Sequence, residues 1–293
     1  MRGWEQLCRD IGRTTGEPFA ATRIERLGGG CINDAWLLAD GRRRFFVKSN
    51  HARALPQFEA EQAGLAEIVA SASVRVPRPL TAGRSEDTAW LVLEYLPLTA
   101  GSRAHGARLG EALANMHRHL GRQFGWIRDN SIGSTPQHNP PTADWVSFWR
   151  GQRLGFQLEL AACNGHYGLQ PEGSRLLEAL DQLFAGHQPL PSLLHGDLWG
   201  GNAGELETGE PVIFDPAVYY GDREADLAMT ELFGGFGADF RAAYAASWPL
   251  DPGYTVRRDL YNLYHVLNHL NLFGGGYRSQ AECLLRRLLA ELA

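Results

Sequence analysis

Three polar residues at fixed distances constrain this chain more than any other feature. Asn202 comes five residues after Asp197, and Asp215 comes eighteen residues after Asp197. A short apolar run precedes each aspartate, at residues 193–194 and at residues 212–214. Such runs are typical of buried strands, so both aspartates are expected in loops that follow strands. Two carboxylates and an amide brought together in this way suit a hard divalent cation, which prefers oxygen ligands.

The order His195-x-Asp197-x-x-x-x-Asn202 is the catalytic-loop pattern of kinase-like folds. In phosphoryl transfer of this kind, one aspartate lies beside the attacking hydroxyl, while an asparagine and a second aspartate hold Mg²⁺. Taken singly, an aspartate after glycine or an asparagine before a small residue is often only a turn former. The ordered set, with both spacings, favours a catalytic site over unrelated turns.

The N-terminal region predicts three strands, a glycine-rich loop and a hairpin. Residues 22–27 and 35–39 have the composition of strands and flank the loop Gly28-Gly29-Gly30-Cys31-Ile32-Asn33. An Asp-Gly pair then signals a hairpin, and residues 44–48 return as a strand that ends on Lys48. Glycines let backbone N–H groups approach a phosphate without side-chain obstruction. A plain hairpin loop is the alternative, because the loop has neither G-x-G-x-x-G nor a Walker lysine.

Residues 55–69 predict a helix whose apolar face carries one carboxylate. Glu61 falls on the same face as Phe58 and Leu65. Burying a carboxylate without a partner is unfavourable, so Glu61 needs a cation, and Lys48 is the candidate. A Lys–Glu pair of this kind orients ATP phosphates in kinases. The alternative is a solvated glutamate at the edge of the apolar stripe.

Residues 89–96 predict a buried strand that ends just before Pro97. In a kinase-like chain this strand leads into the hinge, whose backbone at Glu94, Tyr95 and Leu96 would meet adenine. We therefore expect an α+β, bilobal, protein-kinase-like fold. Residues 1–95 would form an N-lobe with an antiparallel sheet and a helix, and residues 96–293 a larger, mainly helical C-lobe with the catalytic loop and the substrate pocket.

Helical spacing of apolar residues predicts several further helices, and residues 129–141 lack any periodicity. The expected helices lie near residues 4–11, 109–120, 144–163 and 174–184, after residue 222, and in the closing segment that holds His265, His269 and Asn271. His265 and His269 are one turn apart, which is the spacing of a metal pair. Because no third ligand is evident, packing or a place in the substrate pocket is the expectation for both.

Composition restricts the partners and the location of the chain. A net charge of −5 and a pI near 6.1 provide no basic surface for nucleic acid. No apolar run is long enough to span a membrane, and the N-terminus lacks the apolar segment of a signal peptide. The four cysteines are far apart and form no C-x-x-C pair, which argues against a zinc site or a disulfide scaffold. These features indicate a cytoplasmic protein.

Several motifs together resemble those of the fructosamine kinases, also called ketosamine-3-kinases. The matching segments are Gly-Gly-Gly-Cys-Ile-Asn at 28–33, Phe-Val-Lys at 46–48, Phe-Glu-Ala-Glu at 58–61, His-Gly-Asp-Leu-Trp-Gly-Gly-Asn at 195–202, Asp-Pro-Ala at 215–217, Tyr-Tyr-Gly-Asp-Arg-Glu at 219–224 and Asn-His-Leu-Asn-Leu-Phe-Gly at 268–274. The tryptophan after His-Gly-Asp-Leu separates this family from the related aminoglycoside phosphotransferases and choline kinases. The resemblance extends over nearly the whole chain.

This resemblance implies an ATP-dependent kinase that phosphorylates the 3-hydroxyl of ketosamines, the fructosamine or ribulosamine adducts of amines and proteins. The product is unstable and releases the amine, so the activity is a deglycation repair. The family pattern makes Asp197 the catalytic base and makes Asn202 and Asp215 the ligands of Mg²⁺, with Mn²⁺ as a substitute. Lys48, paired with Glu61, would hold the α- and β-phosphates under the 28–33 loop.

The same resemblance implies that Trp199 offers a flat face to the ketosamine sugar. We add His269 and Asn271 to the expected substrate pocket because of their place in the closing helices. Cys31 lies in the phosphate loop, where backbone N–H groups favour the thiolate. We therefore expect a redox-sensitive residue that links two chains into a homodimer on oxidation, or else an inert side chain in a monomer.

Two other functions stay open at this stage. One is a small-molecule kinase of the aminoglycoside or choline kinase type, and the other is a ligand-binding pseudokinase. A pseudokinase is expected to lack at least one of Lys48, Asp197, Asn202 and Asp215, and all four are present. The sequence does not distinguish among ketosamines, or between free and protein-bound amines.

Overall fold

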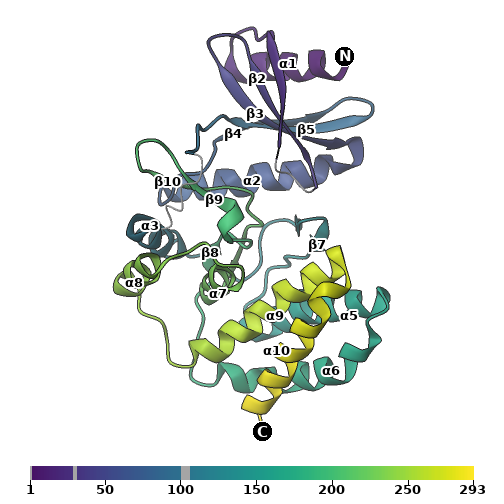
Figure 1. Cartoon of the computed structure of the whole chain (residues 1–293), viewed down its shortest axis with the longest axis vertical. Helices are drawn as coiled ribbons and strands as arrows, with labels where there is room; N and C mark the ends of the chain where they lie inside the picture. Colours follow the sequence, from purple (N-terminus) through teal and green to yellow (C-terminus); the bar gives the residue numbers. More distant parts are fainter. Residues whose placement is uncertain (1, 29–31, 100–105) are drawn as a thin grey trace.

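A five-stranded antiparallel sheet and two helices form the N-terminal lobe. The computed structural model describes residues 2–28, 32–99 and 106–293. The strands follow the order β1-β2-β3-β5-β4 across the sheet. Their bounds are β1 (Arg23–Leu27), β2 (Asp34–Ala39), β3 (Arg44–His51), β4 (Pro79–Arg84) and β5 (Thr88–Glu94), and the helices are α1 (Arg2–Thr15) and α2 (Leu55–Ser71). Figure 1 shows α1 and α2 on opposite faces of the sheet.

Side-chain alternation along β5 explains why this sheet is covered on both faces. Trp90 and Val92 pack in one apolar cluster with Leu7 and Ile11 of α1. The intervening Leu91 belongs to the other cluster, which contains α2 and the helical part of the chain. Because successive strand residues point to opposite faces, one strand contributes to both cores. The sheet is thereby fixed between α1 and the rest of the molecule.

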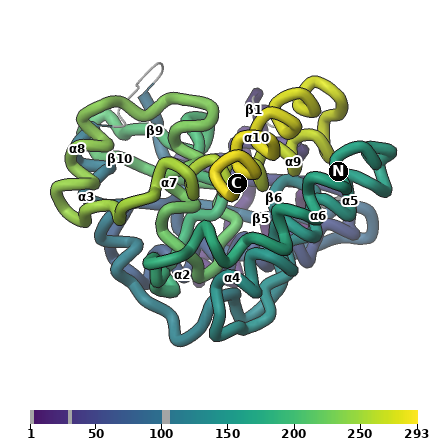
Figure 2. Tube along the Cα trace, turned by 90° about the horizontal axis from the view of Figure 1, so that it is seen from below, coloured from purple at the N-terminus to yellow at the C-terminus, as the bar shows by residue number. Residues whose placement is uncertain are grey.

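The second lobe is mainly helical. Its elements are α3 (Ala107–His117), β6 (Asn130–Ile132), β7 (Thr135–Gln137), α4 (Trp145–Phe148), a π-helical segment (Trp149–Gly155), α5 (Phe156–Cys163), α6 (Gln170–Ala179), β8 (Ser192–Leu194), β9 (Ala203–Glu205), β10 (Pro211–Ile213), β11 (Tyr219–Gly221), α7 (Glu224–Leu232), α8 (Ala238–Ser247), α9 (Tyr254–Phe273) and α10 (Arg278–Glu291). Short 3₁₀ turns lie at Ala52–Ala54, Tyr167–Leu169, Leu180–Phe184, Gly200–Asn202 and Gly275–Tyr277. From below, α3 and α8 lie on one side and α5, α6, α9 and α10 on the other (Figure 2). No helix in the described ranges is long and apolar enough to cross a membrane.

The two lobes share one apolar core through α2. Phe58, Leu65 and Ile68 of α2 are buried in the cluster that also contains the helices of the second lobe. At Gly64 a Cβ atom would lie 3.0 Å from a methyl group of Val218, so this helix packs closely on the segment after Asp215. The α+β class is confirmed. The sheet ends at Glu94, and the lobe boundary at residues 95–96 stays a prediction.

Three local features differ from the expectations. Strand β4 was not among the strands expected from the sequence; it begins at Pro79 and has a bulge before Thr81. Proline is tolerated at the first residue of an edge strand, so its presence did not exclude one. Residues 129–141, which lack apolar periodicity, contain the β6–β7 hairpin, whose three-residue strands are too short to produce a periodic signal. The helix expected at 144–163 is interrupted by a π-helical segment.

Candidate active site

Two small antiparallel pairs bring the catalytic segments together. Strand β8 pairs with β11, and β9 pairs with β10. The loop after β8 carries Asp197 and Asn202, and the loop after β10 carries Asp215. Two backbone hydrogen bonds join these loops: Phe214 N–H donates to Asn202 O at 3.0 Å, and Ala217 N–H donates to His195 O at 2.8 Å. Asp215 on one loop therefore meets Asp197 and Asn202 on the other.

The turn into the catalytic loop requires glycine. Gly196 has φ of +82°, in the left-handed region that residues with a Cβ rarely adopt. A Cβ atom there would lie only 2.1 Å from the carbonyl oxygen of Ala217. Strain and a backbone clash both exclude a side chain, so the close approach of the two loops depends on this glycine.

A buried carboxylate on α7 holds the same turn. Asp226 is 1% exposed, and its two oxygens accept from the backbone N–H groups of His195 at 2.7 Å and Gly196 at 2.8 Å. The Nε2 of His117 lies 3.2 Å from the same carboxylate. Burial by itself raises the pKa of Asp226, but the hydrogen bonds from His117 and the backbone lower it below its ordinary value. The ionised carboxylate thus anchors the catalytic loop to the helical core.

His195 bridges the two loops as a neutral imidazole. Burial lowers the pKa of His195. Its Nδ1 accepts from the backbone N–H of Asp197 at 3.3 Å, and its Nε2 lies 2.9 Å from the carbonyl oxygen of Phe214. The carbonyl can only accept, so Nε2 carries the proton. The His195 side chain therefore links the backbone of Phe214, the residue before Asp215, to the backbone of Asp197.

Asp197 lies in a buried, acidic environment. The pKa of Asp197 is raised well above its ordinary value, chiefly by burial and then by the nearby charge of Asp215. The Nδ2 of Asn202 donates to the Asp197 carbonyl at 2.9 Å and to its Oδ2 at 3.2 Å. These bonds use the amide nitrogen of Asn202, so its amide oxygen is the atom that can coordinate a cation. A higher pKa gives the carboxylate more affinity for a proton.

Lys48 forms the predicted pair with Glu61, and Asp215 joins it. The Nζ of Lys48 lies 2.6 Å from Glu61 Oε1 and 2.6 Å from Asp215 Oδ1. Burial lowers the pKa of Lys48, but the charges of Asp215 and Glu61 outweigh it and raise the pKa. Asp215 has φ of +58°, a strained conformation for a residue other than glycine. Its carboxylate is half exposed and faces both the lysine and the catalytic loop.

The described part of the glycine loop is anchored to the strand that carries Lys48. The Nδ2 of Asn50 donates to Ile32 O at 3.1 Å and to Asn33 Oδ1 at 2.8 Å. Gly28 is exposed, and nothing lies within 4 Å of where its Cβ would be. Gly29, Gly30 and Cys31 lie outside the described residues, and so do the redox and dimer predictions for Cys31.

An apolar cavity of about 120 Å³ lies beside the predicted hinge. Its lining is Phe46, Pro77, Leu93, Glu94, Leu96, Leu98, Val212, Phe214 and Asp215. Tyr95 is absent from this lining, and its ring instead lies under the guanidinium of Arg44, 4.8 Å from the ring centroid. A larger hollow of about 710 Å³, lined by Trp4, Trp36 and Trp90, contains no residue of the catalytic loop. The smaller cavity includes Asp215 in its lining and so reaches the loop after β10.

Trp199 and His269 belong to one aromatic group, but Asn271 does not. Trp199 is 40% exposed, and its ring makes an edge contact with Phe233, 6.3 Å between centroids. Phe233 in turn contacts His269 at 4.7 Å. Sequence reasoning missed Phe233, whose only local signal is the Gly-Gly turn after it. The Asn271 amide instead donates to Gln157 O at 3.1 Å and Oε1 at 2.8 Å, which ties α9 to α5.

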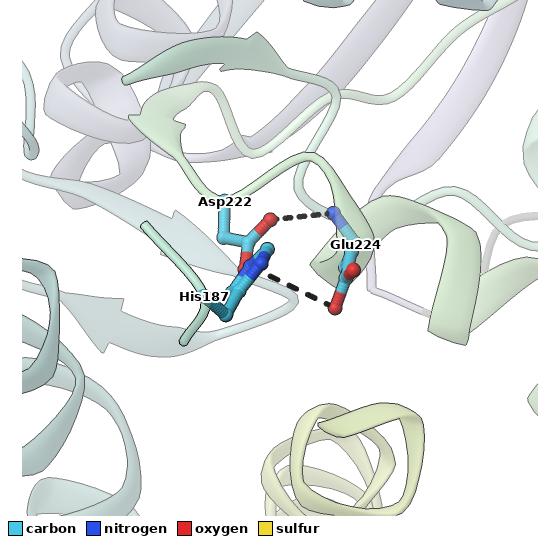
Figure 3. Close-up of side chains that lie close together, drawn as sticks. All are labelled: His187, Asp222 and Glu224. Carbon is cyan, nitrogen blue, oxygen red and sulfur yellow. Dashed lines mark hydrogen bonds and ion pairs between the residues drawn. The ribbon is translucent and has the colours of Figure 1, made fainter. Parts of the chain in front are cut away.

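A second buried cluster carries residue types that often bind metals, but its two carboxylates already bind protein groups. The ligand atoms of His187, Asp222 and Glu224 lie within 4.8 Å of one another (Figure 3). Asp222 Oδ2 accepts from His187 at 2.7 Å and from Tyr261 at 2.6 Å. Arg257 binds both oxygens of Glu224, at 2.7 and 2.9 Å. A guanidinium already balances the carboxylates, so the geometry favours an internal ion-pair network.

A sequence profile of the fructosamine kinase family matches residues 3–291. The chain belongs to the fructosamine kinase family. Its relatives include a Synechocystis protein named "Probable ketoamine kinase", 48% identical over 98% of this chain and 97% of the relative. A rice protein named "Protein-ribulosamine 3-kinase, chloroplastic" is 43% identical over 93% of this chain and 80% of its own length.

Solved structures place the fold in the same group. A Haemophilus somnus protein described as a candidate fructosamine-3-kinase superposes with a TM-score of 0.90 at 27% identity, covering 98% of both chains. An aminoglycoside phosphotransferase superposes with a TM-score of 0.60 at 16% identity, covering 98% of this chain and 99% of that one, which shows a shared fold alone. The predicted protein-kinase-like fold is confirmed, and use of ATP follows from it.

We predict that Asp226→Asn weakens both folding and catalysis. The amide can accept only one of the two backbone N–H groups, and the loss of a hydrogen bond to a charged group corresponds to about 1.5–3 kcal/mol. Thermal and urea unfolding should show this decrease, and kcat should fall because Asp197 loses its position. Asp239→Asn, an exposed aspartate on α8, is the matched control. Unchanged stability and kcat in Asp226→Asn would contradict the anchoring role.

We also predict that His187 makes a pH-dependent contribution to the stability of the protein. Burial lowers the pKa of His187, but the hydrogen bond and charge of Asp222 outweigh burial and raise it. The charge of Glu224 raises this pKa further, whereas Arg257 opposes the increase. A group whose pKa is higher in the folded than in the unfolded protein stabilises the fold fully at pH values below its unfolded pKa. This stabilisation is lost as the pH rises through the pKa of the folded protein. His187 Nδ1 also lies 2.9 Å from Asp251, which favours the cation further.

His187→Gln should therefore lower the Tm by about 2 °C or more at pH 6 and by less at pH 9. Differential scanning calorimetry at both pH values measures the two differences. His119→Gln, an exposed histidine, should show no such dependence. A larger decrease for His187→Gln at pH 9 than at pH 6 would rule out the charged pair.

Proposed function

We propose that this protein transfers the γ-phosphoryl group of ATP to the 3-hydroxyl of ketosamines, the fructosamine or ribulosamine adducts of amines and proteins. The observation that carries the proposal is the convergence of Asp197, Asn202, Asp215 and Lys48 in one site. Membership of the fructosamine kinase family, with relatives named ketoamine kinase and ribulosamine 3-kinase, supports the substrate class. The resulting activity is deglycation of amines.

In this proposal Asp197 accepts the proton of the attacking hydroxyl. Its raised pKa suits that task, because a stronger base accepts a proton more readily. The hydrogen bonds from Asn202 and the backbone link to His195 fix the carboxylate in one orientation. The substrate sugar lies against Trp199, whose half-exposed ring presents an apolar face two residues after the base.

The donor set at Asn202 and Asp215 fits a hard divalent cation. An amide oxygen and a carboxylate are the ligands that Mg²⁺ prefers, and Mn²⁺ shares this preference. Asp215 Oδ1 is paired with Lys48, and its other oxygen has no hydrogen-bond partner among the described residues. Asn202 and Asp215 would hold the ion, which would supply positive charge to offset the negative charge of the transferred phosphoryl group.

The apolar cavity next to Glu94 and Leu96 is the proposed site of the adenine ring. Its apolar walls suit a flat heteroaromatic ring, and it ends at Asp215, where the phosphates must arrive. Lys48 then lies beside the α- and β-phosphates, held by Glu61. We do not include Tyr95 in this pocket, since its ring lies against Arg44.

A cytoplasmic location stays a prediction, because the rice relative is named as chloroplastic.

The test is ATP consumption with Mg²⁺ on ribuloselysine, fructoselysine, kanamycin and choline. We expect turnover on at least one ketosamine, and a decrease in kcat of about 10²–10⁴-fold or more in Asp197→Asn, the range for a general base. The isosteric amide preserves the shape but cannot accept the proton. Asp239→Asn is the matched surface control.

Turnover only on kanamycin or choline would keep the mechanism but reject the proposed substrate class. ATP binding without turnover on any acceptor would support the pseudokinase interpretation. Full activity of Asp197→Asn on a ketosamine would reject Asp197 as the base.

A further inference from the structure

A continuous series of aromatic rings leads away from the catalytic loop. It begins at Trp199 and passes through Phe233 to His269, with 6.3 and 4.7 Å between successive ring centroids. His269 also contacts Phe273 at 5.6 Å and Tyr277 at 5.1 Å. The rings come from the catalytic loop, from the chain just after α7, and from α9 and the turn into α10. This aromatic series therefore connects Asp197 with the end of α9, which lies beside β7 in Figure 1.

Three of these rings remain open to solvent. Trp199 is 40% exposed, Phe233 37% and Phe273 57%. Single exposed aromatic residues are ordinary, but contiguous ones beside a catalytic aspartate indicate a binding surface. Aromatic faces carry negative charge density and attract organic cations, especially ammonium groups. The exposed faces thus select for an apolar or cationic occupant.

His269 contributes an acceptor and no positive charge. Its Nδ1 lies 2.8 Å from the carbonyl oxygen of His265, which can only accept, so Nδ1 carries the proton. Burial lowers the pKa of His269, so the ring is neutral near pH 7 and its Nε2 is an acceptor. The neighbouring His265 is also neutral, because burial lowers its pKa to about 3. Neither ring repels a cation.

We propose that Phe233, Phe273 and His269 bind the secondary ammonium group and the attached alkyl chain of the ketosamine. The proposal rests on the proposed function, and it assigns the part of the substrate that Trp199 does not contact. In a ketosamine the amine nitrogen is bonded to C1, and only C1, C2 and C3 separate it from the hydroxyl that meets Asp197. An ammonium that follows a sugar on Trp199 therefore reaches Phe233, the next ring of the series.

Two features make the ammonium the favoured occupant. The ring faces stabilise its charge, and the His269 Nε2 can accept one of its N–H groups. Phe273, the most exposed ring, then lines the path of the alkyl chain toward solvent, where a lysine side chain would join a peptide.

The test compares two matched substrates that differ in a single atom, and therefore in the positive charge and the N–H groups at that position. One is a ribulosamine of an alkylamine, and the other is the ether in which oxygen replaces the amine nitrogen. Phe233→Leu and Phe273→Leu remove the ring but keep apolar bulk. Tyr167→Leu, an exposed aromatic residue on the 3₁₀ turn before α6, is the control.

We expect Phe233→Leu to raise the KM of the ammonium substrate about tenfold, which lies between the effect of an exposed and that of a desolvated cation–π contact, with kcat nearly unchanged. The KM of the ether should change less than about twofold, because it lacks the charge that the ring attracts. Equal increases for both substrates would reduce the rings to an apolar contact, and no increase for either would remove them from the site. Both outcomes overturn the proposal.

Isothermal titration calorimetry without ATP separates this inference from the proposed function. Tighter binding of the ammonium compound than of the ether, lost in Phe233→Leu, supports the ammonium site even if no ketosamine is phosphorylated. Equal binding of both compounds, or binding of neither, overturns it even if the protein proves to be a ketosamine kinase.

Discussion

The active site depends on one buried carboxylate that binds two backbone N–H groups. Asp226 lies on α7, and its hydrogen bonds to His195 and Gly196 hold the turn before Asp197, the proposed base. Because Gly196 has a left-handed conformation pressed against Ala217, the turn can approach the chain after Asp215 closely. The carboxylate of Asp226 thus ties the turn at Gly196 to the helical core, and this turn lies against the loop after β10.

The site that this anchor holds is rich in negative charge. Asp197, Asp215 and Asp226 lie close enough that the charges of the other two raise the pKa of Asp197, in addition to its burial. Lys48 offsets part of this charge through its pairs with Asp215 and Glu61. The β6–β7 hairpin supports the same region, since Gln137 and Asn130 donate to Ala217 O and Val218 O. Acidic groups held in this way suit a divalent cation.

Residue spacing revealed the parts of the site that lie on one chain segment or on one helix face. The spacing from Asp197 to Asn202 and the position of Glu61 on an apolar stripe are of this kind, and the Lys48–Glu61 pair is present. Partners that depend on tertiary packing left no such signal. Asp226 resembles an ordinary residue in the first turn of a helix, and Phe233 resembles a loop aromatic.

Asn271 is a residue that the sequence assigned to the substrate pocket and that tertiary packing places elsewhere. It shares the closing helix with His269 but faces α5, because residues two apart on a helix point in different directions. The short β6–β7 strands and the π-helical segment were also beyond periodicity, because each depends on contacts made elsewhere in the chain. Sequence motifs therefore predicted phosphoryl transfer, whereas tertiary packing determines which other side chains lie around the site.

The most direct measurement of the central claim is the position of the phosphate on the product. Two-dimensional ³¹P–¹H NMR of ribuloselysine, incubated with the protein, ATP and Mg²⁺, identifies the phosphorylated oxygen. Our account predicts that phosphorus couples to the proton on C3, and that free lysine then appears as the product decomposes. Coupling to a terminal methylene group, with no release of lysine, would contradict it.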